Sequence, residues 1–127
     1  MARKRTSKSI KNACDKLLRL IVIKRDADAN GYAVCCSCGK IAHYTDMDAG
    51  HWINRGCMKT RYELKNVHLQ CRHCNRYREG NGPGYSMFML NKYGTEVMDD
   101  LIELSKMICQ RKQKDWLEVE KWLKGKL

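Results

Sequence analysis

The first regular pattern along the chain is that of a helix. From about Ser9 onward, apolar residues recur with the spacing of one helix face, at Ala13, Leu17, Leu18, Leu20 and Ile21. The pattern ends in the polar sequence DADANG at 26–31, where Gly31 is a natural helix stop. We therefore predict an N-terminal helix over 9–30, preceded by a flexible basic arm over 1–8.

The central segment, 32–80, alternates short apolar runs with turns. YAV leads into the cysteine turn CCSCGK, and IAHYT and MDAGHWI both have the composition of strands. NRG at 54–56 predicts a turn, NVHLQ at 66–70 a further strand, and RHCNRYRE a short helix. The centre is therefore predicted to fold in the order strand, strand, helix.

The C-terminal part, 85–127, is predicted to be helical and follows a linker signal, NGPG at 81–84. YSMFMLNKYG predicts a short helix that ends at Gly94. Thr95 is then placed to cap a second helix. The apolar positions of this helix are Val97, Leu101, Leu104 and Ile108, and those of a third are Trp116, Leu117, Val119 and Leu123. We expect these faces to pack in the core or in a homodimer.

These patterns predict an α+β fold that is mostly helical. A chain of 127 residues is long enough for one modest core, so we expect a single domain over 1–127. The longest wholly apolar run, LIVI at 20–23, is far too short to span a membrane, and no signal-peptide pattern follows the basic start. We expect a protein of the cytosol, where cysteines serve as thiols or metal ligands rather than disulfides.

The charge adds a candidate partner, because the net charge of +11 is unevenly distributed. Residues 1–25 carry nine basic residues and one acidic residue, whereas residues 95–127 carry seven of each. A second basic concentration covers residues 51–78. Such focused charge favours a nucleic acid partner, although an acidic protein or an anionic membrane is an alternative. On the predicted first helix, Lys16 and Arg19 form a basic face available to phosphate.

The cysteine spacing predicts a structural zinc site. Cys35 and Cys38 form one C-x-x-C turn and Cys71 and Cys74 a second, and four thiolates are a common ligand set for tetrahedral Zn²⁺. The 32 residues between the two turns exceed the roughly 15–20 of common zinc fingers, so the ion would staple the ends of a larger insert. Two alternatives remain open at this point. Cys36 offers another register for the first turn, and His73 lies inside the second and offers a nitrogen ligand.

The insert contains the sequence DAGHW, and the second cysteine turn is followed at once by Asn75. Joining the two turns would bring the strand bearing His51 to the helix bearing Asn75. A neutral imidazole can take a proton from water near neutral pH, and a side-chain amide oxygen is a ligand for a hard divalent cation. The alternative is that His51 is an ordinary half-buried strand residue. His43 and His68 lack neighbouring motif residues and are interpreted as packing or surface groups.

Together these motifs resemble a known group of nucleases. The order C-x-x-C, a strand with a histidine, N-V-x-x-Q and C-x-x-C-N resembles the HNH, or ββα-metal, endonucleases. CCSCG, DAGHWINRG, RYELKNVHLQCRHCN and the later YG at 93–94 are more closely similar to the NinG/Rap family of lambdoid phages, over about residues 17–105. The resemblance implies a zinc-stapled ββα-metal core between an N-terminal helix and C-terminal amphipathic helices. It also implies cleavage of branched recombination intermediates such as Holliday junctions or D-loops, in the cytoplasm of the host cell.

The resemblance also implies roles for particular residues. His51 matches the general base, Asn75 the asparagine that binds a catalytic Mg²⁺ or Mn²⁺, and Asn66 the middle asparagine that holds the loop between the strands. The aspartate that many HNH sites carry before the histidine is here Gly50. Asp48 is then either a second ligand of the catalytic cation or a structural residue, as in the D-R-G-H motif of nonspecific ββα nucleases.

The sequence therefore predicts an HNH-type, metal-dependent DNA endonuclease, and its alternative is a non-catalytic, zinc-stapled nucleic-acid-binding module. Arg55 follows the histidine in a turn and either contacts the scissile phosphate or is merely exposed to solvent. Arg72, Arg76 and Arg78 are predicted to contact backbone phosphates, which give affinity rather than sequence preference.

Overall fold

The computed structural model describes residues 4–127, which group into two compact units. One consists of residues 22–109 and the other of residues 4–21 together with 110–127. The fold is mixed α/β and about 54% helical, as the sequence predicted. The elements, in chain order, are α1 (Ser7–Asp26), β1 (Tyr32–Val34), β2 (Ile41–His43), η1 (Tyr44–Asp46), β3 (Met47–His51), η2 (Leu64–Asn66), β4 (Val67–Cys71), η3 (His73–Tyr77), α2 (Gly82–Tyr93), α3 (Thr95–Ser105) and α4 (Gln113–Lys124).

Helix α1 is displaced at both ends from the predicted range of 9–30. It begins at Ser7 because the Thr6 hydroxyl accepts a hydrogen bond from the Ser9 amide at 3.1 Å and so caps the first turn. It ends at Asp26 because the Asp28 carboxylate accepts hydrogen bonds from the amides of Asn30 and Tyr32, both at 2.9 Å, which forms a turn instead. The predicted basic arm is therefore shorter than 1–8, and its residues 1–3 lie outside the described part of the chain.

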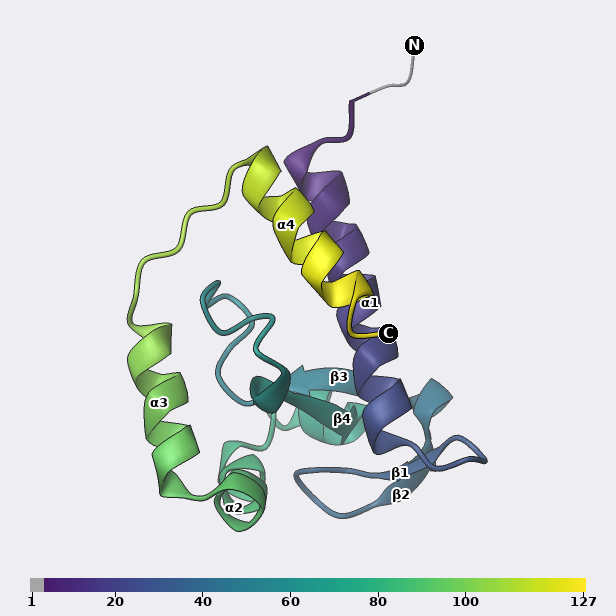
Figure 1. Cartoon of the computed structure of the whole chain (residues 1–127). Helices are drawn as coiled ribbons and strands as arrows, with labels where there is room; N and C mark the ends of the chain where they lie inside the picture. Colours follow the sequence, from purple (N-terminus) through teal and green to yellow (C-terminus); the bar gives the residue numbers. More distant parts are fainter. Residues whose placement is uncertain (1–3) are drawn as a thin grey trace. The chain divides into compact units, whose positions relative to one another are not determined.

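In the unit formed by residues 4–21 and 110–127, α4 packs beside the first part of α1 (Figure 1). The contact buries Ile10, Cys14, Leu18, Trp116 and Leu123. Arg5 donates two hydrogen bonds to the Glu120 carboxylate, at 2.9 and 2.8 Å, and this pairing lowers the pKa of Glu120. The amphipathic pattern predicted for α4 is thus correct, except that Leu117 is 43% exposed.

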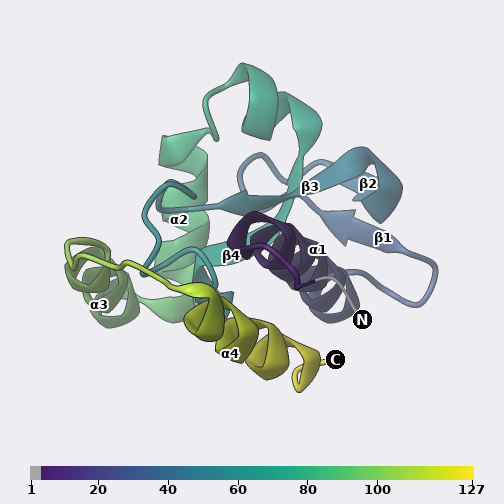
Figure 2. The same ribbon diagram turned by 90° about the horizontal axis from the view of Figure 1, so that it is seen from above.

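The other unit contains two small antiparallel sheets, β1–β2 and β3–β4. In Figures 1 and 2 the β3–β4 ribbon lies between the β1–β2 hairpin and α2. Register pairs Met47 with Cys71 and His51 with Val67. The last turn of α1 contacts this ribbon, because the Asp26 carboxylate accepts from the Leu69 amide at 3.1 Å. The order β3, β4, η3 is the predicted order strand, strand, helix.

Helices α2 and α3 cover a small apolar core that includes Cys36, Tyr85, Met89 and Leu101. The predicted linker contains the start of α2, which begins at Gly82 because Pro83 fits the first helical turn. Helix α2 ends before Gly94, as predicted, and Gly94 has a left-handed φ of 86°.

Two expectations for α3 are wrong. Thr95 is the first helical residue rather than the cap, which is Gly94. Ile108 lies beyond the end of α3 at Ser105 and is 89% exposed, so it does not extend the apolar face. Among residues 4–127, no helix combines the length and the apolar character that crossing a bilayer requires.

Candidate functional site

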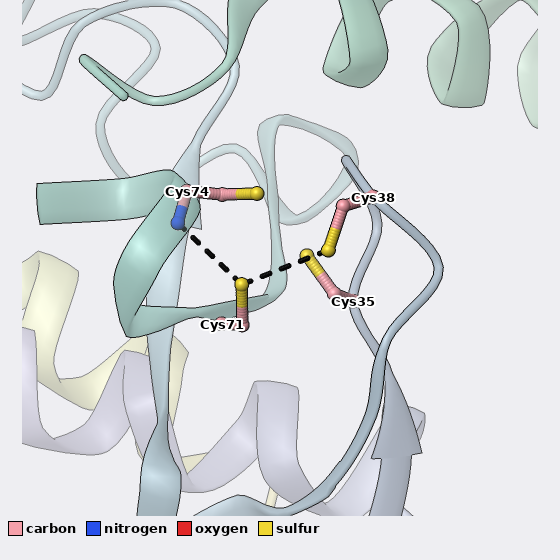
Figure 3. Close-up of side chains that lie close together, drawn as sticks. All are labelled: Cys35, Cys38, Cys71 and Cys74. Atoms are coloured by element: carbon pink, nitrogen blue, oxygen red, sulfur yellow. Dashed lines mark hydrogen bonds between the residues drawn. The ribbon is translucent and has the colours of Figure 1, made fainter. Parts of the chain in front are cut away.

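The two cysteine turns meet at one point of the fold. The sulfur atoms of Cys35, Cys38, Cys71 and Cys74 all lie within 4.8 Å of one another. Figure 3 shows Cys35 and Cys38 pointing from the β1–β2 loop toward Cys71, at the end of β4, and Cys74, in η3. Tight local turns make this possible: the Gly39 amide donates to the Cys35 carbonyl at 3.0 Å, and Gly39 has a left-handed φ of 79°.

The four sulfurs fit a tetrahedral zinc ion. Zinc–sulfur bonds of about 2.3 Å require sulfur separations of about 3.8 Å, and the sulfurs of Cys38 and Cys71 are 3.7 Å apart. Backbone amides also face the sulfurs, since Ser37 donates to Cys35 and Cys74 donates to Cys71, both at 3.4 Å. These donors stabilise thiolates, the form in which cysteine binds metal. The cluster is therefore suited to a structural metal ion such as zinc.

Neither alternative ligand belongs to the cluster. The Cys36 thiol lies in the apolar core with Tyr85, and its hydrogen bond to Cys35 together with burial raises its pKa. The same hydrogen bond lowers the pKa of Cys35; backbone amide donors add to this effect and burial opposes it. His73 is exposed, and its ring stacks on that of Tyr77 with centroids 6.1 Å apart.

His51, the last residue of β3, is half-buried and has a defined tautomer. Its Nε2 atom lies 2.9 Å from the backbone carbonyl oxygen of Arg61. A carbonyl oxygen only accepts hydrogen bonds, so Nε2 carries the proton and the basic lone pair of the neutral ring is on Nδ1.

The Arg61 carbonyl belongs to the long loop between β3 and β4, and Asn66 holds this loop in place. Asn66 is fully buried, and its oxygen accepts from the Ile53 amide at 2.8 Å. Its side-chain nitrogen donates to the carbonyl oxygens of Ile53 and Thr60, both at 3.2 Å. These three hydrogen bonds fix the loop between β3 and β4.

Asn75, in η3, is tied to Asp48, in β3. The Asn75 amide nitrogen donates to the Asp48 carboxylate at 3.0 Å, and Arg76 donates to both oxygens of the same carboxylate, each at 3.0 Å. Burial opposes ionisation of Asp48, but the bonds from Arg76 and Asn75 outweigh it and lower its pKa. The arrangement turns the nitrogen of Asn75 toward Asp48 and leaves the amide oxygen as the atom that can bind a cation.

His51 and Asn75 line the same pocket, of about 430 Å³. Its wall also includes Ala49, Arg55 and Glu79. In a strand alternate side chains point to opposite faces, so Asp48 lies on the other face of β3 from Ala49 and His51 and is not part of the wall. The pocket wall therefore combines an imidazole, a side-chain amide, a guanidinium and a carboxylate.

The family model for the bacteriophage lambda NinG protein matches residues 1–127, the whole chain. The chain belongs to the NinG family. Curated relatives called protein ninG are 32% identical in Escherichia phage 933W, 31% in Escherichia phage lambda and 29% in Salmonella phage P22, each over 68 residues. These matches cover 53% of this chain and 33% of each relative, so the chain matches about a third of the length of the NinG proteins it resembles. No solved structure matches.

The sequence of this NinG-family chain did not reveal a buried hydrogen-bond network around His68. Tyr85 donates to the Gly50 carbonyl at 2.7 Å, so His68 Nδ1–H donates to the Tyr85 hydroxyl at 3.0 Å and Tyr93 donates to His68 Nε2 at 2.8 Å. Burial, with a contribution from the charge of Arg25, lowers the pKa of His68 to about 3, and the ring stays neutral. This network fixes the carbonyl group of Gly50, which directly precedes His51. Its one sequence signal is the pairing of a strand histidine with two later tyrosines.

The basic residues predicted to contact phosphate have different surroundings. Arg55 lines the pocket, whereas Arg76 is paired with Asp48. Arg72 donates to the Thr45 carbonyl at 2.6 Å and is 45% exposed in its side chain, and Arg78 is exposed. Lys16 and Arg19 lie on α1, in the unit formed by 4–21 and 110–127. Lys16 is exposed and Arg19 half-buried.

Proposed function

We propose that this NinG-family chain is a divalent-metal-dependent DNA endonuclease of the HNH type, in which four thiolates hold a structural zinc ion. The observation that carries the proposal is the shared pocket of His51 and Asn75. A non-catalytic DNA-binding module would use the basic charge and the cysteine cluster equally well. It would have no use for an imidazole of fixed tautomer beside an amide oxygen in a pocket.

His51 is the proposed general base. Its Nε2–H group donates a hydrogen bond to the Arg61 carbonyl. The lone pair on Nδ1 of His51 therefore accepts the proton from a water molecule. The water oxygen forms a bond to phosphorus while the bond from phosphorus to the 3′-oxygen breaks, and the departing oxygen takes a proton from solvent. The products carry a 5′-phosphate and a 3′-hydroxyl, as the resemblance to HNH enzymes implies.

Asn75 is the proposed ligand of a catalytic Mg²⁺ or Mn²⁺, through its side-chain oxygen, a donor that such hard cations prefer. A divalent cation bound there supplies positive charge that stabilises the leaving oxygen. The carboxylate of Asp48 accepts hydrogen bonds from Asn75 and Arg76. We therefore assign Asp48 to positioning Asn75 rather than to binding the cation directly. Arg55, on the pocket wall, is the proposed contact of the scissile phosphate.

The substrate is proposed to be branched DNA, such as a Holliday junction or D-loop, on the strength of the family resemblance. Arg72, Arg78, Lys16 and Arg19 would contact backbone phosphates outside the pocket. Cutting both strands of a junction favours a homodimer, and the exposed Leu117 and Trp122 of α4, 43% and 46% exposed, offer apolar surface for one. The site of action would be the cytoplasm of the host cell.

The test compares purified wild-type protein with His51→Ala and with His43→Ala, a matched change at a histidine outside the pocket. Each is incubated with a four-way junction and with linear duplex, in Mg²⁺ or in EDTA. We expect Mg²⁺-dependent cleavage by the wild type and His43→Ala, and a loss of at least about 100-fold in His51→Ala, since general bases contribute on that scale. Tight binding of intact DNA by all three proteins would instead identify a non-catalytic module.

A further inference from the structure

We propose that Glu79 is the second protein ligand of the divalent cation, beside Asn75. This inference rests on the proposed function and assigns a residue that the sequence motifs do not include. Among residues 4–127, Glu79 is the single carboxylate on the wall of the pocket that holds His51 and Asn75.

The pocket needs a negative charge from the protein. The amide oxygen of Asn75 carries no net charge, and the same wall contains the cation Arg55. Hard divalent cations bind most strongly to sites that include carboxylate oxygens, and magnesium sites commonly use one or two carboxylates with substrate phosphate. With Asn75 alone, a cation would be attracted only by the phosphate of the substrate.

Position 50 cannot supply the carboxylate. A Cβ atom at Gly50 would lie 2.1 Å from Oε1 and 2.9 Å from Cβ of Gln70. Gln70 is fully buried, and its amide donates to Ser37 Oγ at 2.7 Å and to the Gly80 carbonyl at 2.6 Å. It cannot move aside without breaking these bonds, so the aspartate that many HNH sites carry before the histidine has no room in this chain.

Asp48 cannot supply it without rearrangement. Both of its oxygens accept hydrogen bonds from Arg76, and one also accepts a hydrogen bond from Asn75. Its side chain leaves β3 on the face opposite to Ala49 and His51, which line the pocket. Moving it into the pocket would break the salt bridge and release Asn75 from its partner.

Glu79 reaches the pocket in the turn that follows the end of η3 at Tyr77. The Arg78 amide donates to the His73 carbonyl at 3.1 Å, and the Gly80 amide donates to the Cys74 carbonyl at 2.8 Å. These two bonds keep the chain beside η3 as it leaves the helix. The chain then turns sharply at Glu79 itself, whose φ of 50° is left-handed. Glu79 and Asn75 lie on the same wall of the pocket.

The experiment measures Mn²⁺ binding rather than activity. Zinc-loaded wild type, Glu79→Gln, Glu79→Asp, Asp48→Asn and the matched surface change Glu63→Gln are titrated with Mn²⁺, and free ion is followed by electron paramagnetic resonance. Circular dichroism and zinc content confirm the fold of each protein. We expect Glu79→Gln to weaken Mn²⁺ binding by at least about tenfold, the scale on which metal sites respond to lost partners. Glu79→Asp should recover part of the loss, and Glu63→Gln should bind like the wild type.

Mn²⁺ binding by Glu79→Gln that equals the wild type would overturn the assignment. If Asp48→Asn loses Mn²⁺ binding and Glu79→Gln does not, Asp48 is the carboxylate ligand and the assignment to Glu79 is wrong as well. If either of these results is obtained while the wild type binds Mn²⁺ and cleaves DNA, this inference alone fails and the proposed nuclease function stands. A wild type that binds no Mn²⁺ overturns both.

Discussion

The side-chain amide of Asn75 donates a hydrogen bond to the carboxylate of Asp48 at 3.0 Å, and this contact joins η3 to β3. Asn75 follows Cys74 directly, so the cysteine cluster fixes the start of the same helix. A metal ion bound at the cluster and the carboxylate on the strand would thus hold Asn75 from two sides. Asn75 and His51 line the same pocket.

The first prediction concerns the cysteine cluster. Cys71→Ser should lose the bound zinc and unfold the unit of residues 22–109, because serine does not replace a thiolate ligand and zinc binding contributes directly to folding. Zinc content by atomic emission and thermal melting by circular dichroism measure the two effects. Cys109→Ser is the matched control, since Cys109 lies outside the cluster. This variant should keep one zinc ion per chain. Full zinc content in Cys71→Ser would contradict the assignment.

The second prediction concerns Asn66. Asn66→Ala should lower the free energy of unfolding by about 2–4 kcal/mol, because the partly buried groups of Ile53 and the buried carbonyl of Thr60 lose their hydrogen-bond partner. Urea denaturation provides the measurement. A loss below about 0.5 kcal/mol, typical of a surface change, would show that Asn66 does not hold the loop.

Features that follow from residue spacing could be predicted from the sequence, whereas features that depend on individual hydrogen bonds or backbone angles could not. The cysteine pairs and the order strand, strand, helix follow from spacing within a few residues, and both are present in the fold. The ends of α1 were missed because the Thr6 hydroxyl and the Asp28 carboxylate compete with the apolar pattern at its two ends.

The candidate site shows the same division. His51 and Asn75 were assigned by their motifs, and the pocket brings them together. The partner of Asp48, Arg76, is 28 residues away in sequence, and no local pattern connects the two. Glu79 was missed because its place on the pocket wall depends on a single left-handed backbone angle, which its sequence neighbourhood does not reveal.

The third prediction is a pH dependence that originates at His68. Its pKa is about 3 in the folded chain and 6.5 in the unfolded chain, so between these values only the unfolded chain binds the proton. Stability should therefore fall as the pH drops below 6.5, with a slope that approaches about 1.4 kcal/mol per pH unit. Arg25 and Lys92 favour the neutral ring, whereas Asp26 opposes it.

Urea unfolding of the zinc-loaded protein at pH 7 and pH 5 measures this effect, with His68→Gln as the comparison. The glutamine side chain does not titrate, so the variant should lose less stability than the wild type over that interval. Equal losses in the two proteins would assign the pH dependence to other groups, such as the zinc thiolates.

The fourth prediction concerns DNA affinity. Arg78→Ala should weaken binding to junction and duplex by similar factors in EDTA, because a phosphate contact carries no sequence or shape preference. It should also reduce the slope of log affinity against log salt by about 1. Fluorescence anisotropy at several salt concentrations measures both quantities. An unchanged slope would show that Arg78 does not contact phosphate.

The most direct test of the central claim is to locate the divalent cation between His51 and Asn75. Mn²⁺ broadens the nuclear magnetic resonance signals of nearby groups, so it is added in small amounts to zinc-loaded, nitrogen-15-labelled protein. The account predicts that the imidazole signals of His51 and the side-chain amide signals of Asn75 broaden together, ahead of those of His43. Broadening at only one of the two side chains, or at neither, would contradict it.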